Sequence, residues 1–454
     1  MSADIVICGA GIAGISAAYH LSARYGLNNI LLIDERPPLT LTSDKSSECY
    51  RNWWPGPGNA MVALMNRSID LLEKLADETG NIFHLNRRGY LFVTARPEAI
   101  PEMEWTARQI SQLGAGPLRV HRGQPGDPKY TPLIENGFEN QPTGADLLLD
   151  TRLIHKYFPY LTSLATAALH VRRAGWFSAR QMGMYLLEQA QSHGVKLIQA
   201  YISGVEIIKD RIAGIRLADG EIIHTGCLVN AAGPMLKEFG QLLDTNLPVF
   251  CELHEKVGFL DTQGIIGRDA PLLIWSDDQY IDWSSEERQI LAEDGELAWL
   301  LEKMPGGVHT RPEGGSDSPI TLMLWEYQTQ QSQPVWPSPS NPQYPEIVLR
   351  GLLQMIPGLS VYLGKSPRPR VDGGYYTKTK DNRPIIGKLP IQGTYVIGAL
   401  SGFGIMSACA AGELLAAYVV DDRLPIYAPA FSLERFSDPA YLKLLTDWET
   451  TWQL

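Results

Sequence analysis

The chain has 454 residues, which is enough to bury a large hydrophobic core and is typical of two or three domains. Its net charge of -11 and the absence of any Lys/Arg block argue against nucleic acid or an anionic membrane as a partner, although local arginines still bind small anions. The five cysteines lie far apart, without a CxxC motif or a Cys/His cluster, so the sequence predicts neither a structural disulfide nor a metal site.

The apolar segment 4–18 is not preceded by basic residues, and no later run reaches 18 apolar residues. Its regularly spaced glycines also differ from the apolar part of a secretory signal. We therefore expect no signal peptide, no transmembrane segment and a cytoplasmic location.

The same segment carries a dinucleotide-binding pattern. Residues 5–8 form an apolar run typical of a buried parallel strand, and Gly9, Gly11 and Gly14 follow in GxGxxG spacing before an expected helix. A second apolar strand ends at Asp34, which lies 20 residues after Gly14.

Each part of this unit has a mechanical role. Gly9 permits a tight turn, Gly11 lets backbone amides approach a pyrophosphate, and Gly14 allows the helix to pack closely on the strand. The helix N-terminus favours the negative charge, and Asp34 accepts hydrogen bonds from a ribose diol. The complete strand–helix–strand unit favours a dinucleotide site over a glycine-rich turn without a ligand.

Two later segments have the same character. Residues 226–236 are a strand that ends in small residues, and residues 394–420 are a strand, a Ser-Gly-Phe-Gly turn and a long helix of small residues. A helix N-terminus directed at a flavin stabilises the negative charge of the reduced ring, a charge that nicotinamide does not develop. This pattern favours FAD over NAD, and a glycine-rich link without a ligand is the alternative for either segment alone.

Several segments along the chain carry the pattern of one enzyme family. They are GAGIAGISAAYHLS, ILLIDE, GWFSARQMGMYLLEQAQSHGV, GIRLADGEIIHTGCLVNAAGP, YYTKTKDNRPIIG, YVIGALSGFGI and FSLERF. Through them, nearly the whole chain resembles the D-amino-acid-oxidase-like superfamily of FAD oxidoreductases, in the branch that contains sarcosine oxidase, glycine oxidase and dimethylglycine dehydrogenase.

The resemblance implies an α/β protein with a Rossmann-like FAD-binding domain and an α+β substrate domain built on a large mixed β-sheet. The implied FAD-binding domain comprises residues 1–80, 150–235 and 365–454. The implied substrate-binding domain comprises residues 81–149 and 236–364.

The resemblance also implies a set of cofactor contacts. They are Gly9, Gly11, Ile12, Ala13, Gly14, Asp34, Glu35, Arg36, Lys45, Ser46, Ser47, Val205, Ala231, Gly233, Ser401, Gly402, Phe403, Gly404, Ile405 and Met406. Family members attach FAD through a cysteine or a histidine, but Gly374 stands at the cysteine position and residues 36–58 contain no histidine. We therefore expect FAD to be bound non-covalently.

Arg51 lies where the family binds the carboxylate of a small amine substrate. A guanidinium offers a planar, bidentate fork to a carboxylate, and it stacks on rings such as those of Tyr50, Trp53 or Trp54. An arginine that only packs aromatic side chains together is the alternative.

Tyr376 and His309 are implied pocket residues, with an ordinary structural role as the alternative for each. Glu48 takes the place of an arginine beside the flavin. It is predicted to hinder flavin reduction or to pair with a substrate ammonium, and a solvated or Arg51-paired carboxylate is the alternative. Arg311 and Arg383 are further candidates for anion contacts, with surface positions as the alternative.

Oxygen, a quinone or an electron carrier would serve as acceptor. The family's oxygen-activating lysine is expected in or near residues 320–328, which contain no lysine, and Met406 replaces a lysine that helps to hold the substrate acid. A positive charge near the flavin stabilises superoxide, so its absence favours a dehydrogenase.

Residues 275–345 look longer than a minimal substrate domain. The stretch 282–304 begins with a pattern typical of a capped helix and carries apolar residues on one face, so we expect a helical lid or partner surface. Five prolines in residues 332–345 predict an exposed loop without helix or sheet.

The favoured function is oxidation of a secondary, N-methylated or D-amino acid, or a similar small amine, by hydride transfer to flavin N5. A 2-hydroxy-acid or glycerol-phosphate dehydrogenase with FAD, a non-catalytic flavoprotein assembly factor and a plain NAD enzyme are the alternatives.

Overall fold

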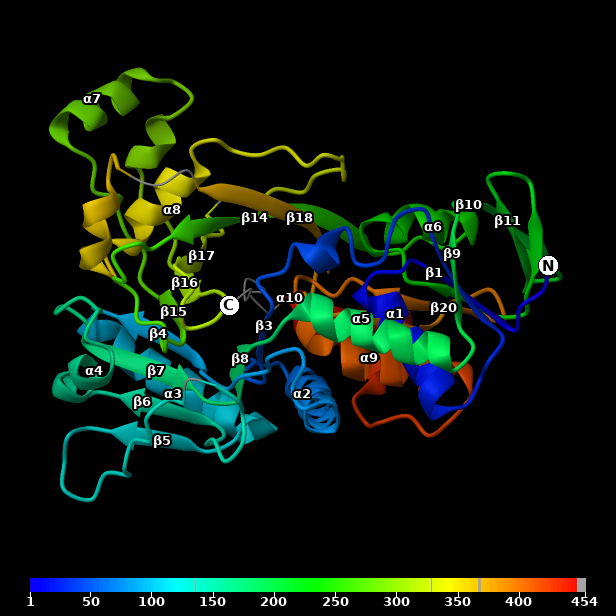
Figure 1. Ribbon diagram of the computed structural model, residues 1–454, viewed down its shortest axis with the longest axis horizontal. Helices are drawn as coiled ribbons and strands as arrows, with labels where there is room; N and C mark the ends of the chain where they lie inside the picture. The colour runs from blue at the N-terminus through cyan, green and yellow to red at the C-terminus, as the bar shows by residue number, and fades with distance from the viewer. Residues whose placement is uncertain (135, 328, 366–368, 447–454) are drawn as a thin grey trace.

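A computed structural model describes residues 1–134, 136–327, 329–365 and 369–446, and it contains two large β-sheets side by side (Figure 1). The smaller sheet has the strand order β19-β20-β13-β1-β2-β9. Its strands are β1 (Ile5–Cys8), β2 (Ile30–Asp34), β9 (Lys196–Gln199), β13 (Leu228–Asn230), β19 (Ile385–Lys388) and β20 (Thr394–Gly398). All neighbours are parallel except β19 and β20, and the central strands are buried on both faces, as a parallel sheet covered by helices requires.

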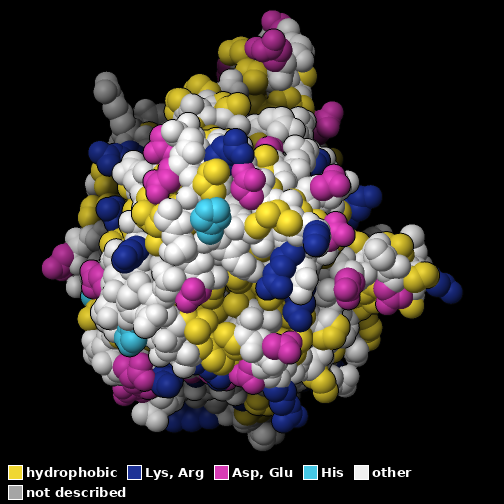
Figure 2. Space-filling model, turned by 90° about the vertical axis from the view of Figure 1, so that its right-hand side faces the viewer, with side chains coloured by type: hydrophobic (Ala, Val, Ile, Leu, Met, Phe, Trp, Pro, Cys, Tyr) yellow, Lys and Arg dark blue, Asp and Glu magenta, His cyan; other side chains and the backbone are white. Residues whose placement is uncertain are grey.

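Helices cover one face of this six-stranded sheet, and a small antiparallel sheet lies beyond the other face (Figure 1). The helices are α1 (Ile12–Tyr19), α2 (Ala60–Thr79), α5 (Ala179–Ser192) and α9 (Gly404–Val419). The opposite side carries β10 (Ile202–Ile208), β11 (Arg211–Leu217), β12 (Ile222–His224) and α6 (Leu236–Leu242). Figure 2 shows the molecule from the right-hand side of Figure 1, the side on which β10 and β11 lie, and acidic and basic side chains are interspersed over this surface.

The larger sheet has the strand order β18-β14-β17-β16-β15-β4-β7-β6-β5 and is mixed, because β15–β4 and β5–β6 are parallel pairs among antiparallel ones. Its strands are β4 (Tyr90–Thr94), β5 (Leu118–His121), β6 (Ala145–Leu148), β7 (Ala167–Val171), β14 (Val249–Leu260), β15 (Leu272–Trp275), β16 (His309–Pro312), β17 (Ile320–Leu324) and β18 (Arg370–Thr379). The helices α3 (Ile100–Ile110), α4 (Thr151–Tyr157), α7 (Ser285–Glu293) and α8 (Tyr344–Leu352) accompany this sheet. The two sheets confirm the predicted fold class.

The chain crosses between the two sheets more often than the predicted domain boundaries allow. The strands β7 and β18 fall in ranges assigned to the FAD-binding domain, yet both belong to the nine-stranded sheet. The strand β18 pairs with β14 from Arg370 to Thr379, and this long ladder fixes its membership. A short ribbon of β3 (Cys49–Arg51) and β8 (Ala174–Trp176) lies between the sheets.

The expected insertion is only partly helical. The helix α7 begins at the predicted cap, where Ser284 and Glu287 form a capping box, but it ends at Glu293, well before the end of the apolar stretch. Residues 332–343 contain neither helix nor strand, as their prolines predict, but the last two residues of the predicted loop 332–345 are helical, because Pro345 is tolerated in the first turn of α8. The helix α10 (Pro439–Thr446) follows at the C-terminal side. None of the helices in the described ranges is both long and apolar enough to cross a membrane.

Candidate functional site

The turn between β1 and α1 is built around two glycines. Gly9 has a φ of +108°, and a Cβ atom there would lie 2.3 Å from the Ala231 carbonyl oxygen. A Cβ atom on Gly14 would lie 1.9 Å from the Gly9 carbonyl oxygen. Only glycine fits either position, so the turn stays narrow and α1 packs tightly on β1.

Polar groups surround the start of α1. The Ile12 amide donates to Ser43 Oγ at 3.0 Å. The two Asp34 oxygens accept the Ala10 amide at 2.7 Å and the Arg36 amide at 2.9 Å. Because each carboxylate oxygen has a second lone pair, Asp34 retains the capacity to accept a hydroxyl.

These groups line a cavity of about 380 Å³ that extends from the glycine turn to the end of β20. Most of the predicted cofactor contacts lie on its wall. They are Gly9, Gly11, Ile12, Ala13, Asp34, Glu35, Arg36, Ser46, Ala231, Gly233, Ser401, Gly402, Gly404 and Ile405. The structure therefore brings three distant segments of the sequence to one site.

Six predicted contacts are not on this wall. They are Gly14, Lys45, Ser47, Val205, Phe403 and Met406. Lys45 forms an ion pair with Asp372 at 3.2 Å, and Val205 pairs with Ile215 within the β10–β11 hairpin. Phe403 and Met406 are buried in the hydrophobic core, because they begin the face of α9 that packs inward.

The sequence-based prediction missed part of the wall. The missed residues include Thr42, Ser43, residues 200–203, Met235, Glu238, Tyr375 and Thr377. Thr42 and Ser43 lie in the same polar loop as the predicted Ser46, and that loop is the signal that would have found them. The others come from different elements, and only the fold brings them to the cavity.

A second cavity, of about 870 Å³, adjoins the first along β18. Tyr375, Tyr376 and Thr377 line the smaller cavity, and Lys378 and Thr379 line the larger one. The other wall residues are Trp53, Pro55, Phe92, Thr94, Arg96, Glu98, Ala99, Glu102, Met103, Thr106, Ile110, Leu169, Phe250, Glu252, Ile274, Ser276, Asp277, Pro305, Gly306, Gly307, Glu326, Thr329, Lys380 and Asn382. A site with apolar walls and a few charged groups suits a small organic ligand.

Tyr376 lies above a charged network at the junction of the two cavities. The His254 ring stacks on the Tyr376 ring with centroids 4.0 Å apart. His254 contacts Glu326 Oε1 at 2.9 Å and Glu252 Oε2 at 3.2 Å, and Lys378 contacts the same Glu252 oxygen at 3.0 Å. Burial alone would lower the pKa of His254, but Glu326 and Glu252 outweigh burial and raise the pKa above its ordinary value.

Arg51 is buried in a stack of aromatic rings, with only 2% of its surface exposed. Its guanidinium carbon lies 4.3 Å from the Trp54 ring centre and 5.6 Å from that of Tyr90. Trp54 in turn packs edge-on against Phe403, 4.3 Å away, in the turn before α9. Arg51 Nε donates to the carbonyl of Trp53, which lines the larger cavity, whereas Arg51 itself is on neither cavity wall.

His309 is buried close to the same charges. Its Nδ1 lies 2.8 Å from the Gly307 carbonyl oxygen, and because a carbonyl only accepts, Nδ1 carries the proton. Burial lowers the pKa of His309, with Glu326 raising it and Arg51 lowering it. The ring is therefore neutral at pH 7, and its Nε2 is an acceptor.

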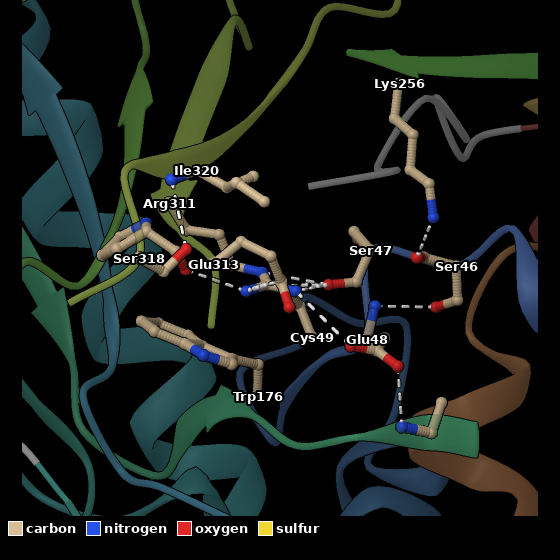
Figure 3. Close-up of polar contacts among 12 residues, drawn as sticks. Ser46, Ser47, Glu48, Cys49, Trp176, Lys256, Arg311, Glu313, Ser318 and Ile320 are labelled. Atoms are coloured by element: carbon tan, nitrogen blue, oxygen red, sulfur yellow. Dashed lines mark hydrogen bonds and ion pairs between the residues drawn. The ribbon is translucent and has the colours of Figure 1, made fainter. Parts of the chain in front are cut away.

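Two cations of the nine-stranded sheet hold the loop before β3 (Figure 3). Lys256 Nζ donates to the Ser46 carbonyl at 2.7 Å. Arg311 donates to the Ser47 carbonyl from Nε at 3.0 Å and from Nη2 at 2.7 Å. The loop next to the smaller cavity is thus fixed from the opposite sheet.

Glu48 belongs to this loop and has a φ of +63°, which is uncommon for a residue with a side chain. Its Oε1 accepts the Ala179 amide at the start of α5, at 2.9 Å, and its Oε2 lies 3.8 Å from Arg311 Nη2. Burial raises the pKa of Glu48, and Arg311 opposes that effect. Glu48 is therefore paired with Arg311 and not with Arg51, as the alternative had it, and it lines neither cavity.

The surface positions offered as alternatives for Arg311 and Arg383 are wrong, because the two residues are 0% and 3% exposed. Arg311 lies between Glu48 and Glu313 (Figure 3). Arg383 Nη2 donates to the Pro57 carbonyl at 2.6 Å. Both cations join separate segments of the protein.

One cavity is lined by the glycine turn, by Asp34 at the end of β2 and by the turn before α9. Comparison with known proteins supports a cofactor site at this place. A family model described as "FAD dependent oxidoreductase" matches residues 4–418. The chain belongs to this family of FAD-dependent oxidoreductases.

Mitochondrial dimethylglycine dehydrogenase of Rattus norvegicus is 24% identical to this flavoenzyme over 466 residues, covering 99% of the chain and 45% of that protein. The chain thus spans about half the length of the curated relatives it matches. L-proline dehydrogenase from P. horikoshii has a similar fold, with a TM-score of 0.74, 20% identity and coverage of 96% of this chain and 98% of that one. Glycine oxidase from Geobacillus kaustophilus gives a TM-score of 0.71 and 15% identity, with coverage of 95% of this chain and 98% of that one.

The residues of this flavoenzyme fit FAD. A side chain at Gly9 or Gly14 would collide with the neighbouring backbone and widen the turn that approaches the pyrophosphate. Asp34 lies where a ribose hydroxyl is expected. The turn at Ser401 and Gly402, with φ of +51° and +83°, directs the start of α9 at the same cavity. FAD is therefore the cofactor that this donor set is built to hold, and the resemblance seen in the sequence is confirmed.

Proposed function

We propose that the chain oxidises a small, carboxylate-bearing amine or amino acid with FAD as the hydride acceptor. The observation that carries this proposal is the larger cavity, which adjoins the cofactor cavity along β18 and has Arg51 buried behind its wall residue Trp53. FAD, when bound, supplies the chemistry by accepting a hydride at N5. The relatives named for dimethylglycine, proline and glycine oxidation are consistent with such a substrate.

In this proposal the protein mainly binds and orients the substrate. Arg51 would bind the carboxylate with its bidentate fork, which requires the wall at Trp53 to open because Arg51 itself lines neither cavity, and Lys378 on the cavity wall provides a second positive charge. Tyr376, on the wall of the smaller cavity, limits the positions open to the reacting carbon and keeps water away from it, whereas His309 is buried, lines neither cavity and contributes only by packing. Glu48 contributes indirectly, because it holds the cofactor-side loop in shape.

We propose further that the predicted contacts on the smaller cavity hold FAD without a covalent bond. Gly374 has no nucleophilic side chain, and the loop before β3 contains no histidine. Precipitation of the protein with acid should therefore release all of the flavin into the supernatant. Flavin that stays with the precipitate would contradict this expectation.

We infer that the physiological acceptor is a quinone or an electron carrier rather than oxygen. The segment expected to hold an oxygen-activating lysine instead carries Glu326, whose negative charge disfavours superoxide formation nearby. Lys256 is a half-buried cation in the neighbourhood, but it donates to the Ser46 carbonyl and lines neither cavity. Substrate-reduced enzyme should be reoxidised slowly by air and rapidly by a soluble quinone.

The central test is anaerobic bleaching of the FAD-loaded enzyme. A panel of N-methyl, secondary and D-amino acids should include members that remove the absorbance of oxidised flavin. Matched 2-hydroxy acids should leave that absorbance unchanged. Bleaching by the hydroxy acids alone would replace the proposal with the hydroxy-acid dehydrogenase alternative.

A further inference from the structure

We propose that Glu326 binds the positively charged amino group of the substrate, so that the enzyme selects zwitterionic amines over simple carboxylic acids. This inference rests on the proposed function, in which Arg51 holds the substrate carboxylate. One small molecule would then lie between two opposite charges, with its acid at Arg51 and its cation at Glu326.

Glu326 is placed to meet a ligand. It follows β17, lines the larger cavity and keeps 22% of its side chain exposed. Its Oε1 contacts His254 at 2.9 Å. The neighbouring acid Glu252 contacts both His254 and Lys378, whereas the direct contact of Glu326 in this network is with His254.

The surroundings keep Glu326 charged. Burial opposes the charged form, but His254, His309 and Lys378 outweigh burial and hold the pKa of Glu326 below its ordinary value. A carboxylate that is partly shielded from water at a cavity wall attracts a cation more strongly than the same carboxylate in bulk water.

The wall of the larger cavity carries more acids than bases. The acids are Glu98, Glu102, Glu252, Asp277 and Glu326, and the bases are Arg96, Lys378 and Lys380. Two of the acids have partners outside the His254 network: Glu98 is bound by Arg96 at 2.9 Å, and Asp277 accepts the Thr94 hydroxyl at 2.6 Å. Glu326 is one of the wall carboxylates that can attract a positive charge on a ligand.

The cavity also has room for substituents on the nitrogen. Its volume of about 870 Å³ lies in the upper part of the range of about 300–1,000 Å³ that is usual for small-molecule sites. Apolar side chains, including Phe92, Leu169 and Ile274, form much of the wall. Secondary, tertiary and quaternary amines would therefore fit as well as a primary amine.

A matched pair of unreactive ligands tests the charge alone. Trimethylammonioacetate and 3,3-dimethylbutyrate have the same shape and the same carboxylate, but only the first carries a positive nitrogen. Their Kd values are measured on the FAD-loaded enzyme from the change in flavin absorbance. We expect the wild type to bind the cationic ligand at least about tenfold more tightly.

The variant Glu326→Gln should reduce this preference to about twofold or less and leave the Kd of 3,3-dimethylbutyrate nearly unchanged. Glu255→Gln is the matched control, because Glu255 is half-buried on the neighbouring β14, accepts the Asn341 amide and lies on neither cavity wall. The control should keep the wild-type preference. Flavin content and thermal melting confirm that both variants are folded.

Equal binding of the two ligands by the wild type would overturn the role of Glu326 without any variant. A preference that survives in Glu326→Gln would overturn it as well. Failure of both ligands to change the flavin spectrum of the wild type is a different result, because it removes the carboxylate site and with it the proposed function.

Discussion

Among individual residues, Gly14 gives the sharpest test of the cofactor site. A methyl group at this position would meet the Gly9 carbonyl oxygen at 1.9 Å, so α1 must move away from β1 in Gly14→Ala. We expect the affinity for FAD, measured by titration of the apoenzyme, to fall at least tenfold, or by about 1.4 kcal/mol. Gly226→Ala is the control, because nothing lies within 4 Å of a Cβ atom added at this position. The FAD affinity of this variant should equal that of the wild type.

Arg51 distinguishes a substrate anchor from a structural arginine. Lysine keeps the charge but loses the bidentate fork and the stacking on Trp54. We therefore expect Arg51→Lys to raise the Kd of carboxylate ligands by about tenfold or more in the folded, FAD-loaded enzyme. The measurement is again the ligand-induced change in flavin absorbance.

Arg172→Lys is the control for that experiment. Arg172 is also buried and lies over the Tyr130 ring, at 5.5 Å, but it belongs to the far part of the nine-stranded sheet. Its replacement should lower the melting temperature and leave ligand affinity unchanged. If Arg51→Lys behaved in the same way, Arg51 would be a packing residue only.

The residues that could be predicted are those whose role is set by nearby sequence. Gly9, Gly14 and Asp34 belong to one strand–helix–strand unit, so their spacing alone defined the site. Glu326 could not be predicted in this way, because its partner His254 lies on β14 in another segment.

At the level of secondary-structure elements, the proline-rich segment 332–343 has a role that its composition does not reveal. The segment is mostly exposed, as predicted, but the Trp336 ring packs against Tyr375 at 5.6 Å and receives the Arg36 guanidinium at 4.9 Å. Arg36 and Tyr375 both line the cofactor cavity. Prolines predict the lack of regular structure, whereas the contact with the cofactor unit depends on how the two sheets are placed.

We therefore expect Trp336→Ala to weaken FAD binding. Loss of the ring frees Arg36 and Tyr375 to move, and one cation–π contact of this kind contributes about 0.5–1 kcal/mol at exposed sites. The Kd of FAD, measured by fluorescence titration, should rise by about two- to fivefold. Val335→Ala, at an adjacent side chain that is 52% exposed, should have no effect. An unchanged Kd in Trp336→Ala would show that the segment only covers the surface.

For the whole molecule, the cofactor cavity is shared between the two sheets. Gly9, Ala231 and Ser401 belong to the six-stranded sheet and its connections, whereas Tyr376 lies on β18 of the nine-stranded sheet. The domain ranges implied by the resemblance group β7 and β18 with the FAD-binding segments, whereas both strands pair within the nine-stranded sheet. Strand pairing with β4 and with β14 decides membership, and such pairing between distant segments leaves no local signal.

Because its site has walls from both sheets, FAD should stabilise the protein as a whole. Free FAD at 100 times its Kd would stabilise the folded state by about 2.7 kcal/mol. The melting temperature should therefore rise with FAD concentration, and the two units should unfold in one transition when FAD is present. Asp34→Ala, which removes the acceptor at the end of β2, should shift this dependence to higher FAD concentrations. A melting temperature that does not respond to FAD, or two separate transitions in its presence, would show that the cofactor does not join the two units.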